Sequence, residues 1–256
     1  MMRVVVAGAN GFIGGATMRA LAAAGHDVAG FDVGDVVPRG DALVWAAGGR
    51  ESSLEANRAV HVGAPNAVTR ATGASHVVYL SSGECYGDVP LPYLENGAAL
   101  GTSDYARAKL EGEQVVAALA PTTVLRLGVV YGPGQSPKMF IPQLVAALRA
   151  GKRFAMTQGT QTRDFVFVDD VAEAIVAALA RPPVSVVNIA SGREIAVRDA
   201  ARIIARAVGA DEALLGFGDI ALRAGEAMRY VLDVSLAARE LDWRARTSLE
   251  AGAARL

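Results

Sequence analysis

The stretch at residues 79–88, YLSSGECYGD, places Ser82 and Glu84 directly after an apolar run. Serine and glycine at this point are typical of a turn that ends a buried strand, so a turn without chemistry is one interpretation. The other interpretation is the floor of an active site, where a serine hydroxyl could polarise a carbonyl group. The stretch alone leaves both interpretations open.

A glycine-rich turn near the start of the chain has the pattern G-x-x-G-x-x-G, follows an apolar segment and opens a helical one. Glycine permits a tight turn and close approach of a pyrophosphate, and a helix N-terminus offers free N–H groups. Helix–strand packing alone would also use glycines, but the position in a βαβ unit predicts dinucleotide binding. The predicted cofactor contacts here are Gly8, Gly11, Phe12, Ile13 and Gly14.

Asp32 ends the second apolar segment, where its carboxylate can accept hydrogen bonds from the ribose of adenosine. A 2′-phosphate would meet like charge at this position. Asp32 therefore favours NAD over NADP as the cofactor.

Tyr105 and Lys109 are four residues apart at the start of a predicted helix, so both side chains lie on one face. A free tyrosine has a pKa of about 10, too high for an efficient base at neutral pH. A nearby ammonium and the positive ring of an oxidised nicotinamide both favour phenolate, which can take a proton from a hydroxyl. The same spacing also occurs in solvent-exposed Tyr–Lys pairs, so the spacing by itself does not show that this pair is catalytic.

The composition limits the function classes. Hydrophobic residues make up 52% of the 256 residues and charged residues 20%, which is typical of a folded soluble protein. The net charge of -1 and the lack of a basic stripe argue against nucleic acid as a partner. No apolar run is long enough to span a membrane, and no signal peptide is recognisable. Cys85 is the single cysteine and the three histidines lack ligand spacing, so we expect a cytoplasmic protein without a metal site.

Strand-like and helix-like segments alternate along the chain, which predicts an α/β fold with a Rossmann-like, doubly wound parallel sheet. The predicted strands are 2–8, 27–32, 42–47, 75–82, 122–130 and 184–190, and the predicted helices are 12–25, 51–73, 103–120, 137–151, 169–182 and 197–209. We expect residues 1–132 to be mainly the dinucleotide-binding domain. Residues 133–256 should form mainly a small substrate-binding lobe, interwoven with the last Rossmann elements.

The link between the second and third predicted strands, residues 33–41, is unusually short. Nine extended residues reach about 30 Å, enough to return along a strand but not to include a helix. This link predicts a shortened sheet edge after the second strand.

Several motifs in this order, GANGFIG, DALVWAAG, LSSGECYGD, YARAKLEGE, RLGVVYGPG, TRDFVFVDDVAEAI, VVNIASG and RYVLDVSLAARELDW, cover nearly the whole chain. Together they resemble the extended short-chain dehydrogenase/reductase family, in its NAD-dependent nucleotide-sugar epimerase/dehydratase branch. The resemblance implies that Ser82, Tyr105 and Lys109 are catalytic, with Lys109 also holding the nicotinamide ribose. It implies further cofactor contacts from Ala46, Ala47 and Tyr105.

Glu84 resembles the glutamate that sugar 4,6-dehydratases and some nucleotide-sugar decarboxylases carry after Ser/Thr-x. In the dehydratases this glutamate works on the proton beside a transient 4-ketone. One dehydratase subgroup has an aspartate acid at the middle position, where this chain has Gly83. A solvated carboxylate at a strand end is the alternative for Glu84, and Cys85 is expected to be a small buried filler.

Arg163 and Arg223 match positions at which family members bind the substrate diphosphate, for which the forked donors of arginine are suited. Each taken alone would be interpreted as a surface arginine. Asp169 and Asp170 are expected to cap the helix that follows them.

The chain departs from the family pattern at three places. Val129 stands where an asparagine often helps to hold the substrate phosphate, and Val60 stands at another usual asparagine. The short link after Asp32 omits a strand and an acidic residue that contacts adenine.

These features predict an NAD-dependent enzyme that oxidises a nucleotide-linked sugar, at C4, to a transient ketone and then returns the hydride, with epimerisation or loss of water. The first alternative is a net keto-sugar reductase or dehydrogenase that consumes NAD(P). An alternative of another class is a dinucleotide-sensing regulator without chemistry, which typically loses the tyrosine or lysine that YARAK retains. The family resemblance also implies a homodimer.

Overall fold

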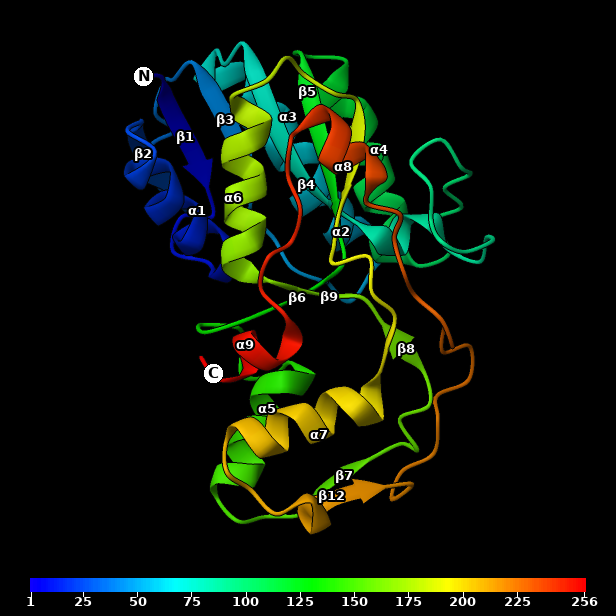
Figure 1. Ribbon diagram of the computed structural model, residues 1–256. Helices are drawn as coiled ribbons and strands as arrows, with labels where there is room; N and C mark the ends of the chain where they lie inside the picture. Colours follow the sequence, from blue (N-terminus) through cyan, green and yellow to red (C-terminus); the bar gives the residue numbers. More distant parts are fainter.

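Six strands form one parallel sheet in the order β10–β5–β4–β3–β1–β2 (Figure 1). The structure, a computed structural model, describes residues 1–256. The strands of this sheet are β1 (Arg3–Ala7), β2 (Asp27–Phe31), β3 (Ala42–Trp45), β4 (His76–Ser82), β5 (Thr122–Leu127) and β10 (Val186–Ile189). The sequence placed all six, and the predicted Rossmann-like α/β class is confirmed.

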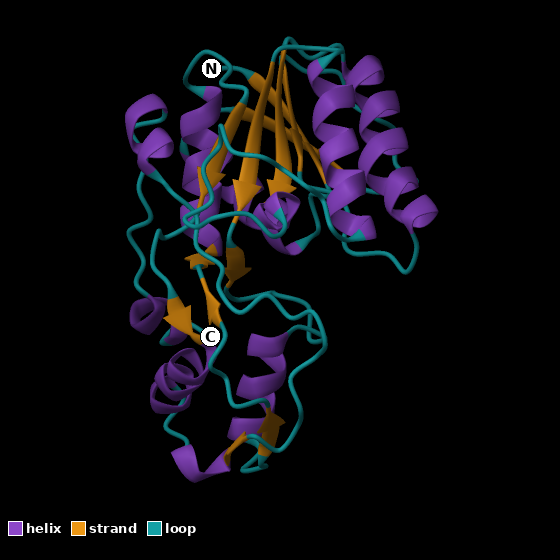
Figure 2. Ribbon diagram, turned by 90° about the vertical axis from the view of Figure 1, so that its right-hand side faces the viewer, coloured by secondary structure: helices purple, strands orange, loops and turns teal.

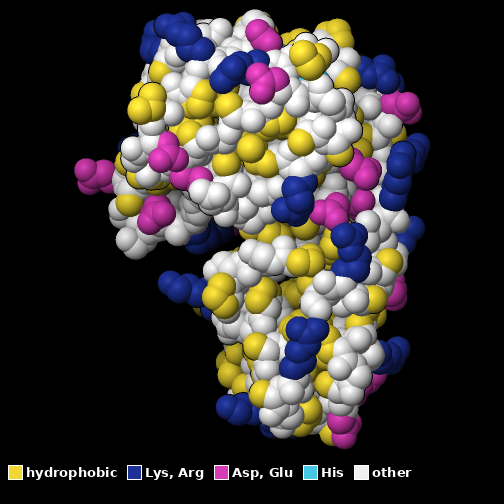
Figure 3. Space-filling view, turned by 90° about the vertical axis from the view of Figure 1, so that its left-hand side faces the viewer, with side chains coloured by type: hydrophobic (Ala, Val, Ile, Leu, Met, Phe, Trp, Pro, Cys, Tyr) yellow, Lys and Arg dark blue, Asp and Glu magenta, His cyan; other side chains and the backbone are white.

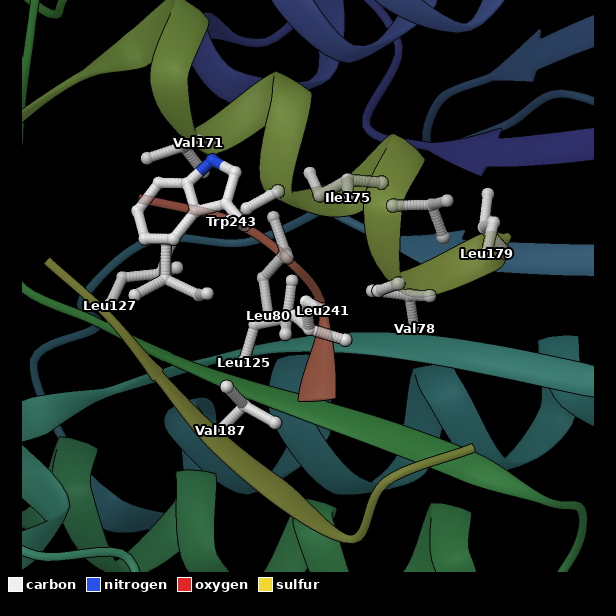
Figure 4. Packing of buried hydrophobic residues seen from close by; sticks show 14 of the residues in the cluster. Val78, Leu80, Leu125, Leu127, Val171, Ile175, Leu179, Val187, Leu241 and Trp243 are labelled. Carbon is white, nitrogen blue, oxygen red and sulfur yellow. The ribbon is translucent and has the colours of Figure 1, made fainter. Parts of the chain in front are cut away.

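Helices cover both faces of the sheet, which explains why its strands are almost continuously apolar. One face carries α1 (Phe12–Ala23), α6 (Val168–Leu179) and α8 (Ser235–Glu240). The other face carries α2 (Leu54–Arg58), α3 (Ala64–Thr72) and α4 (Asp104–Ala117), with a π-helical turn, η1 (Ala59–Gly63), between α2 and α3. In β1, Val4 and Val6 therefore pack against α1 and α6, whereas Val5 faces the opposite layer. Figure 4 shows the first of these cores, where Trp243 packs beside Val171 and Leu127.

The predicted shortening after β2 is confirmed. Residues 32–41 return to the start of β3 without a helix, and β2 is the edge strand with β1 as its single neighbour. The sheet thus ends at the strand that carries Asp32 at its carboxyl end.

A second lobe lies beyond the carboxyl ends of the strands (Figures 1 and 2). Its elements are α5 (Phe140–Arg149), α7 (Val197–Ala207), α9 (Leu249–Ala253), the 3-10 turn η3 (Glu212–Leu214) and the strand pairs β7 (Phe154–Met156)–β12 (Leu215–Phe217), β8 (Thr162–Arg163)–β11 (Ile195–Ala196) and β6 (Val129–Tyr131)–β9 (Phe165–Phe167). The chain returns from this lobe to the sheet in α6 and β10, so the two parts are interwoven. The division of roles at residue 132 stays a prediction. None of the helices combines the length and hydropathy needed to cross a bilayer.

The predicted strand 122–130 is divided at Gly128. A Cβ at Gly128 would lie 2.8 Å from the carbonyl oxygen of Asp164. The chain bends away from the sheet at this close approach, and the Val129 amide donates to the same carbonyl at 2.7 Å. The mostly apolar run continues through the bend, which is why the sequence did not reveal the bend.

The predicted helix 51–73 is also divided. Pro65 has no N–H to donate to the carbonyl of His61 four residues earlier. That carbonyl accepts instead from the hydroxyl of Tyr79 at 2.9 Å, and the backbone widens into the π-turn η1.

The expectation that Asp169 and Asp170 cap α6 is wrong. Helix α6 has no side-chain cap, and the buried Asp170 carboxylate accepts from the Arg246 and Thr247 amides at 3.2 and 2.9 Å. Asp169 pairs with Arg255. Both carboxylates therefore anchor the C-terminal segment on α6, a long-range role that local spacing does not express.

Candidate active site

Ser82 is the last residue of β4 and accepts a hydrogen bond from the Glu84 amide at 3.1 Å, which opens the 3-10 turn η2 (Gly83–Tyr86). Both interpretations of YLSSGECYGD are therefore compatible with the backbone: the stretch is a turn, and the turn lies at the carboxyl edge of the sheet. This edge is where ligands of open α/β sheets bind. Cys85 is fully buried in η2, and burial raises the pKa of its thiol to about 11.

Tyr105 and Lys109 lie on the first turns of α4 and face this edge. The Lys109 ammonium donates to the carbonyl of Leu80 at 2.9 Å and lies 5.8 Å from the centre of the Tyr105 ring. Burial of Lys109 lowers its pKa to about 8. The structure thus brings Ser82, Tyr105 and Lys109 together from two elements.

Burial raises the pKa of the Tyr105 phenol well above its usual value, and the neighbouring Cys85 and Glu84 raise it further. Two groups act in the opposite direction: the charge of Arg50 and the hydroxyl of Ser82 both lower the pKa. In the ligand-free chain the phenol is therefore protonated at neutral pH.

Glu84 is not a free carboxylate at a strand end. Its Oε1 accepts from the Ser103 hydroxyl at 2.6 Å, and its Oε2 pairs with the guanidinium of Arg50. The Arg50 Cζ lies 4.7 Å from the centre of the Tyr105 ring. Sequence reasoning missed Arg50 and Ser103, although Arg50 follows the Ala46–Ala47 pair by three residues.

His61 is a further residue that sequence reasoning left unassigned. Its buried ring meets the Tyr105 ring edge-on at 5.3 Å, and its Nε2 is 2.7 Å from the carbonyl of Gly49. Burial and the nearby Lys109 charge lower the pKa of His61 to about 4. The histidine is therefore neutral in the folded chain, with Nε2 as donor.

This pKa predicts acid destabilisation. The unfolded His61 takes up a proton as the pH falls below about 6.5, whereas the folded one resists until about pH 4. The wild type should therefore lose up to about 3 kcal/mol of unfolding free energy through His61 between pH 6.5 and pH 4, and His61→Gln should not show this loss. Urea unfolding of both proteins at pH 7, 5.5 and 4 measures it. Equal losses in the two proteins would contradict the prediction.

The glycine-rich turn follows β1 and opens α1, as predicted. A Cβ at Gly8 would lie 2.7 Å from the Cα of Ala47, and a Cβ at Gly14 would lie 1.9 Å from the carbonyl oxygen of Gly8. Helix α1 has no side-chain cap and no acidic residue in its first turn. The backbone thus forms a cradle at a positive helix end, which fits a pyrophosphate.

Asp32 lies beside this cradle. Its Oδ2 accepts from the amide of Asn10 in the turn at 3.0 Å, and its own amide donates to Asp35 at 2.8 Å. The position suits contact with a ribose. The predicted Ala46 and Ala47 follow β3 on the other side of the turn, and Ala46 donates to the carbonyl of Ala7 at 3.1 Å.

Arg163 and Arg223 line one pocket of about 470 Å³ in the second lobe. The Arg163 guanidinium is already engaged: it donates to the Ala227 carbonyl at 2.9 Å and pairs with Glu226. Val129 lines the same pocket, so the departure from the family asparagine gives this wall an apolar side chain.

The segment that carries Arg223 continues to the floor of the site. A Cβ at Gly83 would lie 2.3 Å from the Tyr230 hydroxyl, so the absence of a side chain at Gly83 admits this tyrosine. Val60, the second departure, lies under Gly48, where a Cβ would be 2.5 Å from its Cγ1. Figure 3 shows the surface hollowed between the two lobes.

A family model described as the NAD dependent epimerase/dehydratase family matches residues 50–190, more than half of the chain. The chain belongs to the NAD-dependent epimerase/dehydratase family. The predicted resemblance is thereby confirmed. The chain has no group of three or more histidine, cysteine or acidic side chains that could hold a metal ion.

Two of the relatives are named for different reactions. A dTDP-L-rhamnose 4-epimerase of Burkholderia thailandensis is 40% identical over 59% of this chain and 44% of its own length. A dTDP-glucose 4,6-dehydratase of Escherichia coli is 26% identical over 70% of the chain and 57% of its own length. The family member therefore spans only about half the length of these relatives. Among solved structures, MoeE5 in complex with UDP-glucose and NAD is 26% identical with a TM-score of 0.88, covering 99% of this chain and 96% of that one.

Proposed function

We propose that this chain is an NAD-dependent enzyme that interconverts the C4 epimers of a nucleotide-linked sugar through a transient 4-ketone. The observation that carries the proposal is the convergence of Ser82, Tyr105 and Lys109 at the carboxyl edge of the sheet that also carries the glycine-rich cradle. The relatives named above, a 4-epimerase and a 4,6-dehydratase, support the same reaction class.

The cofactor would be held by the backbone at Gly8 and Gly14, by Asp32 and by Lys109. The residues fit NAD because the tight backbone of the turn, which a side chain at either glycine would force apart, leaves the start of α1 open to a pyrophosphate, and because Asp32 disfavours a 2′-phosphate. NAD, when bound, supplies reversible hydride uptake at the sugar carbon, which converts a carbinol to a ketone and back.

The catalytic residues would handle the proton and the oxygen. Tyr105 takes the proton of the sugar hydroxyl as the ketone forms and returns it afterwards. Ser82 donates a hydrogen bond to the same oxygen, and the Lys109 ammonium stabilises the phenolate. Because burial lowers the pKa of Lys109 to about 8, we expect this support to weaken in alkaline solution.

The pocket of the second lobe would take the nucleotide. Its volume, about 470 Å³, lies in the range of small-ligand sites, and its lining combines apolar residues with Arg163 and Arg223. The forked donors of these arginines suit a diphosphate. Arg163 would exchange its contact with Glu226 for the ligand.

Epimerisation is favoured over dehydration by the contacts of Glu84. Both of its oxygens are engaged, by Ser103 and Arg50, so the carboxylate is not free to remove a ring proton. Gly83 also lacks the acid that one dehydratase subgroup carries. A 4,6-dehydratase is the second candidate, because Glu84 stands at the position where dehydratases carry their glutamate; the contacts of its two oxygens argue against that role.

The proposal is tested by product analysis after incubation with UDP-, dTDP- and GDP-sugars in heavy water. We expect unchanged substrate mass and an inverted C4 centre in the proton NMR spectrum. Loss of water with uptake of deuterium would support the dehydratase. Stoichiometric oxidation of added NAD(P)H would support the net reductase, and stoichiometric reduction of added NAD(P) would support the net dehydrogenase. Binding without any product would support a regulator.

We further propose a homodimer in the cytoplasm. The family resemblance supports the dimer, and the composition of the chain supports the location. A sedimentation run that gives monomers at working concentration would exclude the dimer.

The cradle gives a matched pair of glycine substitutions. Gly14→Ala places a Cβ against the Gly8 carbonyl, so we expect about tenfold or greater loss of NAD affinity and about 1–3 kcal/mol of destabilisation. Gly15→Ala meets only ordinary contacts, at 3.6 Å from the Ala9 carbonyl, and should bind NAD normally. Calorimetric titration with NAD compares them, and equal affinities would contradict the role of the turn.

A further inference from the structure

Arg50 lies over the proposed catalytic tyrosine although it belongs to neither element that carries the catalytic residues. It follows β3, and its Cζ is 4.7 Å from the centre of the Tyr105 ring. Its side chain keeps 56% of its surface exposed and pairs with Glu84 of η2. A guanidinium against the face of a phenol is attracted by the ring and favours the phenolate by its charge.

Glu84 connects Arg50 to the start of α4. The carboxylate accepts from the Ser103 hydroxyl, and Ser103 is the N-cap of α4, whose side chain accepts from the Ala106 amide at 3.1 Å. In the sequence, Tyr105 lies between Ser103 and Ala106. The chain of contacts Arg50–Glu84–Ser103 therefore joins the ends of β3 and β4 to the turn of α4 that presents the phenol.

We propose that Arg50 is a positioning residue that, paired with Glu84, orients Tyr105 and sets its proton affinity. The inference rests on the proposed function and deepens it. Glu84 takes part in the same positioning of Tyr105. Its negative charge opposes formation of the phenolate, whereas the positive charge of Arg50 promotes it.

The other groups that face Tyr105 do not replace Arg50. His61 of η1 is neutral, and the buried thiol of Cys85 remains protonated at neutral pH. Lys109 is cationic, but its charge is lost near pH 8. The arginine charge persists at any pH at which the protein is folded, so Arg50 is the permanent cation at this phenol.

The test is a pH titration of Tyr105 in the NAD complex, followed by the NMR resonance of Cζ in protein labelled with [13C]tyrosine and assigned with Tyr105→Phe. We expect Arg50→Met to raise the midpoint by about one pH unit and Glu84→Gln to lower it by about as much. The double variant should titrate near the wild type, and Arg50→Lys should restore most of the shift. Removal of a merely structural contact would not give opposite signs from the two partners.

Arg58→Met is the matched control. Arg58 also forms a half-exposed ion pair, with Glu111 of α4, but lies in α2 and makes no contact with Tyr105. It should leave the midpoint unchanged. The proposal is overturned if Arg50→Met leaves the midpoint at the wild-type value, if Arg58→Met shifts it equally, or if wild-type Tyr105 stays protonated up to the pH of unfolding.

The outcome is separable from that of the proposed function. The titration needs NAD but no sugar. A shifted Tyr105 midpoint in a protein that turns over no nucleotide sugar would refute the enzyme and retain the role of Arg50. Turnover of a nucleotide sugar together with an unshifted midpoint in Arg50→Met would support the enzyme and refute the role of Arg50.

Discussion

Replacing Tyr105 with phenylalanine is expected to lower turnover by about 10²–10⁴-fold without unfolding the protein, because it removes the group that exchanges the sugar proton. The ring and its contacts remain, including the edge-on packing of His61 at 5.3 Å and the Arg50 guanidinium at 4.7 Å. NAD affinity should change little. Initial rates under saturating NAD and sugar measure the effect.

Tyr93→Phe is the control for this variant. The buried Tyr93 hydroxyl donates to the Gly87 carbonyl at 3.0 Å, so its removal costs one hydrogen bond, about 1 kcal/mol of stability. Its turnover should stay within a few-fold of the wild type. A Tyr105→Phe protein that keeps its rate would reject the phenol as the proton acceptor, and unchanged biological activity without chemistry would favour the dinucleotide-sensing regulator.

Replacing Glu113 with alanine is expected to destabilise the fold by about 3–5 kcal/mol, because it leaves the guanidinium of Arg126 buried without a counter-charge. The two side chains are 8% and 6% exposed and form a two-pronged contact, at 3.0 and 2.8 Å. The Ser81 hydroxyl also donates to Glu113. Urea unfolding at pH 7 measures the loss.

Glu111→Ala removes a similar contact on the same helix and provides the comparison. The Glu111–Arg58 pair is half-exposed, so its loss should cost less than about 1 kcal/mol. Equal destabilisation by the two substitutions would show that burial does not determine the effect. Because Glu113 lies one helical turn after Lys109, Glu113→Ala should also disturb the position of Lys109 on α4 and so lower the activity.

The sequence by itself determined the secondary-structure elements and those site residues that short sequence patterns can identify. Apolar runs bounded by turn residues predicted all six strands of the main sheet, and the short link 33–41 predicted its reduced edge. The glycine spacing predicted the cradle at Gly8 and Gly14. The i, i+4 spacing placed Tyr105 and Lys109 on one helix face, and the family resemblance joined Ser82 to them.

Only the tertiary structure decided how distant segments meet. Glu84 was predicted as an acid/base or a solvated carboxylate, but its two oxygens are taken by Ser103 and by Arg50, 19 and 34 residues away. Pro65 leaves the carbonyl of His61 without its helical donor, and only the fold brings the hydroxyl of Tyr79 from β4 to that carbonyl. Such contacts depend on which strands are neighbours in a parallel sheet, where segments far apart in the chain converge at one edge. A linear pattern carries no information on that convergence, and so the groups that set the charge around Tyr105 emerged only from the fold.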